Sequence, residues 1–258
     1  MDDWIHDCNR QIKAKRTLQA QEFVCRITKT HVHFATDLGC GPGNSTELLA
    51  HKWPDAQITG IDSSAAMLEQ AQERLPSCAF QQADIRHWQP SQPQQVIYAN
   101  ASLQWLTDHQ TLLPHLVNQL DIGGALAVQM PDNLEEPSHR LMREVAASER
   151  WQSHISAQAA DRKRLLTTEN YFDLLSDAGC QVDIWRTTYY HPMADAQGII
   201  TWLRATGLRP FLATLDEAQQ AEFLHDYHQA LLPAYPSRHN GQVLLAFPRL
   251  FLVAVRTR

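Results

Sequence analysis

Short apolar segments alternate with amphipathic segments through the first half of the chain, and polar residues or glycines separate them. The apolar segments have the length of strands and the amphipathic segments have the length of helices. Strands are expected at His33–Leu38, Gln57–Ile61, Cys78–Ala83, Gln95–Ala99 and Ala125–Met130. Helices are expected at Ser45–His51, Ala65–Leu75 and Thr111–Leu120, the last closed by Gly123-Gly124. This alternation predicts a parallel sheet with helices on both faces.

The second half of the chain contains fewer strands and more helical sequence. Helices are expected at Ser138–Ser148 and Glu169–Ala178, and strands at Gln181–Tyr190 and Val243–Val255, with an interruption at Pro248. Residues 192–241 look mainly helical, as does Asn9–Arg26 before the first strand. Such a long connection inside a sheet usually carries function. We therefore expect a helical lid at residues 1–30 and a main domain at 31–258 with a helical insertion at about 192–241.

The composition is that of an ordinary globular protein. Hydrophobic residues make up 44% of the chain and charged residues 19%, so extensive disorder is not expected. A net charge of -6 provides no overall attraction for nucleic acid or an anionic membrane. The first residues lack the apolar region of a signal peptide, and no apolar run is long enough to span a bilayer.

The five cysteines are scattered, without a C-x-x-C pair or a His/Cys cluster of the zinc type. This pattern predicts reduced thiols in a cytoplasmic protein and no metal site. The oligomeric state is left open by the sequence.

A glycine-rich turn follows the first predicted strand, in Asp37-Leu38-Gly39-Cys40-Gly41-Pro42-Gly43-Asn44. Glycines let the backbone approach a ligand closely, and the free N–H groups of the next helix point toward the same place. The spacing is G-x-G-x-G, whereas the dinucleotide fingerprint places its third glycine one position later, which disfavours NAD or FAD. A purely structural turn is the alternative.

Three more strands end in polar or small residues, where ligands of open α/β sheets bind. Asp62 can accept hydrogen bonds from ribose hydroxyls, or it can simply cap the helix that begins near Ser63. Asp84 can receive the exocyclic amine of adenine while Ile85 packs on the ring. Asn100-Ala101-Ser102 ends the fourth strand. Four such ends in this order favour a nucleoside-containing ligand over four unrelated structural features.

These residues resemble the class I methyltransferases that use S-adenosyl-L-methionine, and in particular the trans-aconitate methyltransferase family. The resemblance runs from about His33 to Val255. It is carried by the segments ITGIDSSAAM, ADIRHWQP, ANASLQWL, LAVQMPDN, VDIWRTTYYH, ATGLRPFL and LLAFPRLFLVA. The resemblance implies a doubly wound, Rossmann-like α/β sheet that is mostly parallel, with an antiparallel last strand and a helical substrate cap.

By the same resemblance, S-adenosyl-L-methionine would occupy the strand ends. The turn with Asp37, Gly39, Cys40, Gly41 and Gly43 would hold its methionine part. Its adenosine would be bound by Asp62, Ser63, Met67, Asp84 and Ile85, and its sulfonium would be faced by Asn100, Ala101 and Trp105.

The resemblance also implies transfer of a methyl group to one carboxylate of trans-aconitate or a similar small polycarboxylate, which yields a monomethyl ester. A carboxylate is already ionised at neutral pH, so no catalytic base is expected. Arginine suits the remaining carboxylates because its planar fork binds them bidentately. The substrate candidates are Arg209 as first choice, Arg249 as second, one of Tyr189 and Tyr190, and Trp202. Each of them can instead be an ordinary surface cation or packing aromatic.

The N-terminal segment departs from the family pattern, because Asn9 and Ile12 stand where a Tyr and a Phe are expected. Loss of two aromatics would loosen a lid, change the substrate or reduce turnover. Two other functions therefore remain open: a methyltransferase for another acid or an acyl-carrier thioester, and a cofactor-binding protein without turnover.

Overall fold

The computed structural model describes residues 19–156, 159, 163–204 and 206–258. The chain folds into two compact units. The first contains residues 1–130, 165–186 and 250–258, and the second contains residues 131–164 and 187–249. Of the predicted lid, residues 1–18 lie outside the described part, Asn9 and Ile12 among them, and residues 19–26 are helical as expected.

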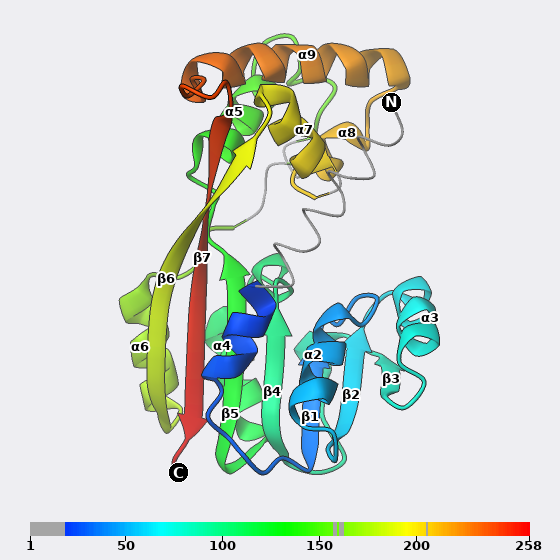
Figure 1. Ribbon diagram of the computed structural model, residues 1–258, viewed down its shortest axis with the longest axis vertical. Coiled ribbons are helices and arrows are strands. Elements are labelled where there is room, and N and C mark those ends of the chain that lie inside the picture. Colours follow the sequence, from blue (N-terminus) through cyan, green and yellow to red (C-terminus); the bar gives the residue numbers. More distant parts are fainter. Residues whose placement is uncertain (1–18, 157–158, 160–162, 205) are drawn as a thin grey trace. The chain divides into compact units, whose positions relative to one another are not determined.

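The first unit is organised around a sheet with the order β3-β2-β1-β4-β5-β7-β6. The strands are β1 Phe34–Leu38, β2 Gln57–Asp62, β3 Ala79–Gln82, β4 Gln94–Asn100, β5 Leu120–Pro131, β6 Cys180–Met193 and β7 Val243–Arg256. Strands β3, β2, β1, β4 and β5 pair in parallel. The last strand, β7, runs opposite to its neighbours β5 and β6 (Figure 1). The predicted fold class is therefore confirmed.

The register places the carboxyl ends of β1, β2 and β4 at one edge of the sheet. Asp37 of β1 pairs with Gly60 of β2 on one side and with Tyr98 of β4 on the other. Because these strands are parallel, the residues that follow Leu38, Ile61 and Ala99 emerge at the same edge.

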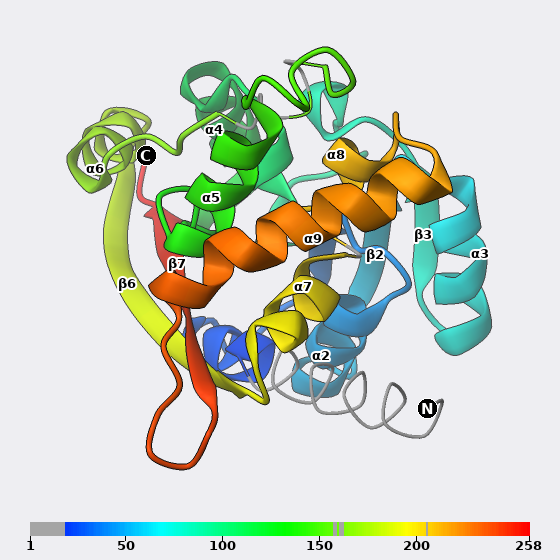
Figure 2. The same cartoon turned by 90° about the horizontal axis from the view of Figure 1, so that it is seen from above.

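Helices cover both faces of this sheet. The helix at residues 19–26 and α2 (Asn44–Lys52) lie on one face, and α4 (His109–Asn118) and α6 (Thr168–Asp177) lie on the other (Figure 2). Buried runs in β1, β4 and β5 are typical of strands covered on both sides. Helix α3 (Ala65–Arg74) starts at Ser64, whose side chain accepts from the Met67 N–H, as expected of an N-cap serine.

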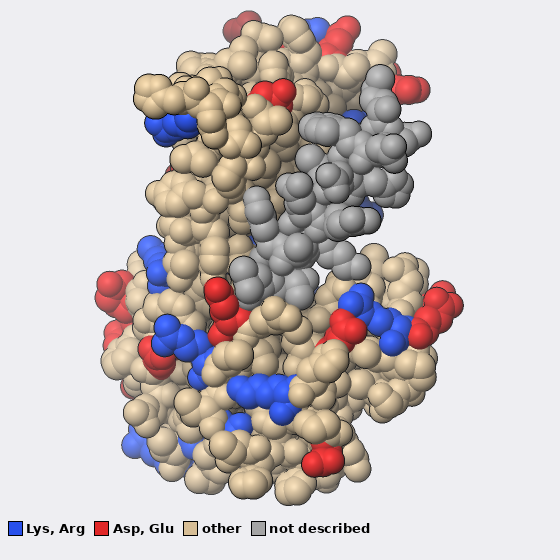
Figure 3. All heavy atoms as spheres, in the orientation of Figure 1, with Lys and Arg blue, Asp and Glu red and all other residues tan. Residues whose placement is uncertain are grey.

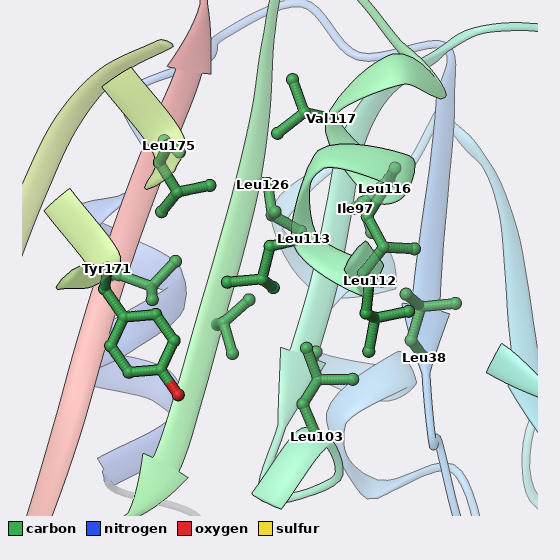
Figure 4. Packing of buried hydrophobic residues seen from close by; sticks show 14 of the residues in the cluster. Leu38, Ile97, Leu103, Leu112, Leu113, Leu116, Val117, Leu126, Tyr171 and Leu175 are labelled. Atoms are coloured by element: carbon green, nitrogen blue, oxygen red, sulfur yellow. The ribbon is translucent and has the colours of Figure 1, made fainter. Parts of the chain in front are cut away.

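The α4 face of the sheet carries the main core. Leu112, Leu113 and Leu116 of α4 are almost fully buried and pack with Ile97 of β4 and Leu126 of β5 (Figure 4). Burying a leucine side chain contributes about 1.5–3 kcal/mol, so this cluster stabilises the helix although Pro114 interrupts its hydrogen-bond ladder.

The opposite face is held by aromatic side chains. Phe23, from the helix at residues 19–26, packs against Tyr98 at a ring distance of 5.3 Å and against Phe251 at the same distance. Trp185 of β6 stacks on Phe251 with centroids 5.2 Å apart. The N-terminal helix is thereby joined to β4, β6 and β7 within the first unit.

The second unit is mainly helical, with α5 (Pro137–Ala146), α7 (Ala196–Arg204), α8 (Arg209–Leu212) and α9 (Glu217–Ala234). Helix α9 lies against α5 and α7 (Figure 2). The buried Tyr227 hydroxyl donates to the Ser138 carbonyl at 2.7 Å, and the Tyr235 hydroxyl accepts from the Ser138 N–H at 3.0 Å. The stretch 192–241, which the sequence predicts to be mainly helical, contains α7, α8 and α9. Residues 131–164 contribute α5 to the same unit.

Two local predictions were wrong. Gly123-Gly124 does not close a helix, because both glycines lie inside β5 and α4 already ends at Asn118. Strand β7 is not interrupted at Pro248: proline lacks an N–H but keeps its carbonyl, which accepts from the Asp132 N–H at 2.9 Å. In the described part of the chain, no helix combines the length and apolarity needed to cross a membrane.

Candidate functional site

The glycine turn after β1 has a backbone that only glycine adopts easily. Gly39, Gly41 and Gly43 have φ values of 72°, 53° and 84°, in the left-handed region. A β-carbon at Gly39 would lie 2.3 Å from the Cβ of Ser102, whereas one at Gly41 would have no atom within 4 Å. Gly39 is therefore required by packing, and Gly41 faces open space.

Asp37, at the end of β1, is fully buried beneath this turn. Its Oδ2 accepts from the hydroxyls of Ser45 and Thr46, both at 2.7 Å. Its buried Oδ1 has no hydrogen-bond partner among the described residues. Burial raises the pKa of Asp37 to about 6, because a low-dielectric environment disfavours the charged carboxylate. One carboxylate oxygen thus remains for a donor from a ligand.

Asp62, at the end of β2, joins the second strand to the glycine turn. Its Oδ2 accepts from the Gly41 N–H and its Oδ1 from the Ser64 N–H, both at 2.9 Å. The residue that caps α3 is Ser64, so the simple capping role considered for Asp62 is not the main one. Ser63 and Met67 lie beside it and are exposed.

Asp84 and Ile85 begin the short 3-10 turn η1 (Ile85–His87) after β3. The Asp84 carboxylate accepts from the backbone N–H and from the guanidinium of Arg86. These hydrogen bonds lower the pKa of Asp84 to about 2. Arg86, which is not among the predicted site residues, therefore orients this carboxylate.

The fourth strand end contains strained backbone. Ala101 has a φ of 56°, which a residue with a β-carbon rarely adopts, and its N–H donates to the Gln129 carbonyl at 2.9 Å. Ser102 donates to the Leu38 carbonyl at 2.7 Å and is the residue that contacts Gly39. The turn η2 (Leu103–Trp105) follows, and Trp105 is 55% exposed. Asn100 is half-buried at the end of β4.

The predicted cofactor residues are thus brought together at one edge of a single sheet. The turn with Asp37, Gly39, Cys40, Gly41 and Gly43 is bound to Asp62 on one side and to Ser102 on the other. Ser102 and Arg86 are the additions that the structure makes. The signal for Ser102 was its place directly after Asn100-Ala101, whereas the signal for Arg86 was only its adjacency to Asp84-Ile85.

The predicted substrate residues lie in the second unit, and they differ in burial. Arg249 on β7 is 6% exposed, with its guanidinium 5.0 Å from the centre of the Phe247 ring. Trp202 on α7 is buried and stacks on His191 at 4.6 Å. Arg209, which begins α8, is exposed. Arg209 was the first choice from the sequence, and His191 and Phe247 were not among the predicted site residues, because burial in this unit is set by contacts between distant segments.

The two tyrosines of β6 point to opposite faces. Tyr189 is half-buried, on the face that His191 shares, whereas Tyr190 is 63% exposed. Strand alternation explains the difference.

Acidic and basic side chains are intermixed on the face shown in Figure 3. This distribution agrees with the modest net charge of -6.

The sheet order and the glycine turn between β1 and α2 agree with the class I methyltransferase fold that the sequence resemblance implies. A family model described as a methyltransferase domain matches residues 35–124. Among solved structures, a putative methyltransferase of Bacillus halodurans has a TM-score of 0.59 at 11% identity and covers 94% of this chain and 99% of that chain. A phosphoethanolamine N-methyltransferase of Haemonchus contortus, solved with S-adenosyl-L-methionine, has a TM-score of 0.55 at 16% identity. The match covers 93% of this chain and 52% of that chain.

Sequence relatives define the particular family. A trans-aconitate 2-methyltransferase of Yersinia pestis is 58% identical over 254 residues, which is 98% of each chain. A protein of the same name from Escherichia fergusonii is 54% identical over 257 residues, which is 100% of each chain. The chain belongs to the trans-aconitate 2-methyltransferase family.

Proposed function

We propose that the protein transfers the methyl group of S-adenosyl-L-methionine to one carboxylate of trans-aconitate, which yields a monomethyl ester. The observation that carries this proposal is identity of 54–58% over nearly the whole chain to proteins named for that activity. The match covers 98% of the chain and therefore spans both units.

The strand ends fit such a cofactor. The open space at Gly41 accommodates a ligand that approaches the backbone, and the free Oδ1 of Asp37 accepts from an ammonium or a water. In this proposal the turn with Asp37, Gly39, Cys40, Gly41 and Gly43 holds the methionine part. Asp62, Ser63 and Met67 bind the ribose side, and Asp84 with Ile85 binds the adenine. Asn100, Ala101 and Trp105 face the sulfonium. When bound, the cofactor supplies an electrophilic methyl group.

For the substrate, we assign Arg249 as the first carboxylate ligand, ahead of Arg209. An arginine that is 6% exposed and flanked by the Phe247 ring has a fixed guanidinium, and a preorganised fork loses little entropy when it binds a carboxylate. Arg209 is exposed, so its side chain is ordered only at an entropic cost. Tyr189 is favoured over Tyr190 by its burial, and Trp202 with His191 supplies an apolar wall.

The proposed reaction needs no catalytic acid or base from the protein. The attacking carboxylate is ionised at neutral pH, and transfer to it removes one negative and one positive charge. Exclusion of water favours this loss of charge, and alignment of the reactants contributes up to about 7–11 kcal/mol. The protein acts by holding the two non-reacting carboxylates and by keeping water from the reacting one.

The test is methyl transfer from labelled S-adenosyl-L-methionine to a panel of di- and tricarboxylates, with esters identified by mass. We expect a labelled monomethyl ester of trans-aconitate. Arg249→Lys is expected to raise the KM for trans-aconitate at least tenfold, because a bidentate pair is lost, with unchanged affinity for S-adenosylhomocysteine. The matched control is Arg204→Ala on the exposed side of α7, which should change neither value.

Other outcomes would change the assigned substrate or the assigned activity. Transfer to a different acid, or to an acyl-carrier thioester, would keep the class and overturn the substrate. Tight cofactor binding without transfer to any acceptor would favour a binding protein without turnover. The cytoplasmic location expected from the cysteine pattern stays a prediction.

A further inference from the structure

Helix α4 carries two histidines whose rings reach backbone carbonyls outside the helix. The Nε2 atom of His109 lies 2.9 Å from the carbonyl oxygen of Leu103, and the Nε2 atom of His115 lies 2.8 Å from that of Trp88. A carbonyl oxygen only accepts hydrogen bonds. Both histidines therefore carry a proton on Nε2 and donate it to the backbone.

The two carbonyls belong to the two short 3-10 turns of the first unit. Leu103 is the first residue of η2, and Trp88 directly follows η1. Each turn is three residues long, and such short segments have few hydrogen bonds of their own. A bond from a neighbouring helix therefore adds a long-range anchor to the local bonds that hold each turn in place.

His109 is itself held in position. Its Nδ1 accepts from the Tyr171 hydroxyl at 2.6 Å, and Tyr171 on α6 is fully buried. Burial also lowers the pKa of His109, which favours the neutral ring. The chain of bonds from Tyr171 through His109 to Leu103 thus has each donor and acceptor assigned.

We propose that His109 and His115 are positioning residues that hold the two cofactor-binding turns from helix α4. This inference rests on the proposed function, in which Asp84 and Ile85 at η1 receive the adenine and Trp105 at η2 faces the sulfonium. Neither histidine is among the residues assigned to the cofactor. One helix, anchored by its leucines on the sheet, thereby sets the positions of two turns that follow different strands.

The test compares asparagine and glutamine at each position. Glutamine places its amide nitrogen near the position of Nε2 and keeps the bond to the carbonyl, whereas asparagine is too short to reach it. Binding of S-adenosylhomocysteine and of adenosine is measured by calorimetry for wild type and for the four variants. Thermal unfolding of each variant is recorded alongside.

We expect His115→Asn to weaken binding of both ligands about fivefold, because η1 meets the adenine in each. His109→Asn is expected to weaken S-adenosylhomocysteine about fivefold and to leave adenosine nearly unchanged, because η2 faces the sulfonium side. Each glutamine variant should recover most of the lost affinity. A purely structural role would instead lower thermal stability equally in both series without this ligand selectivity.

Tyr171→Phe removes the hydroxyl that orients His109 and is expected to weaken S-adenosylhomocysteine binding about threefold. Tyr227→Phe is its matched control, since it also removes a buried tyrosine hydroxyl that donates one hydrogen bond, in this case to the Ser138 carbonyl in the second unit. It should lower stability and leave cofactor affinity unchanged.

If wild type fails to bind S-adenosylhomocysteine, the cofactor assignment itself is wrong. If wild type binds it and both asparagine variants bind equally well, the cofactor assignment stands and the positioning role of the histidines is overturned.

Discussion

The carboxylate of Asp62 accepts a hydrogen bond from the backbone N–H of Gly41 at 2.9 Å, so the end of β2 fixes the glycine turn that follows β1. The second oxygen accepts from the Ser64 N–H at the start of α3. One side chain therefore links three segments at the carboxyl edge of the sheet. A carboxylate with both oxygens on backbone N–H groups is held in one orientation, as a ribose ligand requires.

Asp62→Ala should weaken S-adenosylhomocysteine binding more than tenfold, because it removes the ribose acceptor and releases the Gly41 N–H. It should also lower the free energy of unfolding by about 1–3 kcal/mol, since two backbone donors lose their partner. Calorimetry and urea unfolding measure the two effects. Asp55→Ala, at an exposed position before β2, is the control, and wild-type affinity in Asp62→Ala would contradict the assignment.

Asp37 should make the stability of the apo protein depend on pH. Its pKa is raised to about 6 by burial, so between about pH 4 and pH 6 the folded state binds a proton that the unfolded state releases. The contribution of Asp37 to the free energy of unfolding is therefore highest at low pH. It falls as the pH rises from about 4 through about 6, because the buried carboxylate must then carry its charge. The shift from 3.8 corresponds to about 3 kcal/mol.

Asp37→Asn has no titrating group and keeps an oxygen that accepts from Ser45 and Thr46. Urea unfolding from about pH 4 to about pH 7 should show the variant gaining stability relative to wild type by up to about 3 kcal/mol. A difference that stays constant over this range would show that Asp37 does not titrate there.

Comparison of Gly39→Ala with Gly41→Ala distinguishes a glycine required by packing from a glycine that leaves space for a ligand. At Gly39 the new β-carbon would meet the Ser102 Cβ at 2.3 Å, so we expect a loss of at least about 2 kcal/mol in the free energy of unfolding. At Gly41 the β-carbon enters open space, so only backbone strain of about 1 kcal/mol is expected.

Ligand affinity should show the opposite sensitivity to that of stability, with Gly41→Ala affected more than Gly39→Ala. The methyl group in Gly41→Ala would occupy space assigned to the cofactor, and its affinity for S-adenosylhomocysteine should fall at least tenfold relative to wild type. Equal affinity in Gly41→Ala and wild type would mean that no ligand approaches this turn.

Ala101→Gly should stabilise the protein and impair its ligand binding. The φ of 56° costs about 1 kcal/mol for a residue with a β-carbon, and glycine relieves this cost. We expect a gain of about 0.5 kcal/mol, reduced by the greater freedom of glycine in the unfolded chain, together with weaker cofactor binding. A loss of stability would indicate that contacts of the alanine methyl group outweigh the backbone strain.

Most of the fold could be predicted from the sequence because strands and helices of an α/β sheet leave local signals. The residues of β1, β2 and β4 follow from apolar runs, and helices α3 and α6 follow from amphipathic runs. The errors fell where local signals conflict with strand pairing. Gly123-Gly124 resembles a helix end, yet β5 begins before it, and Pro248 resembles a strand break, yet only its carbonyl is needed.

The sequence by itself determined the sheet, the glycine turn and the acidic residues at the strand ends, because each is specified by neighbours within a few positions. Only the tertiary structure decided that Asp62 binds Gly41, that Arg249 is buried while Arg209 is exposed, and that Tyr189 rather than Tyr190 is half-buried. It also brought His109, Leu103 and Tyr171 into one chain of hydrogen bonds. Burial and hydrogen-bond partners depend on residues that are distant in the chain, and no local pattern records them.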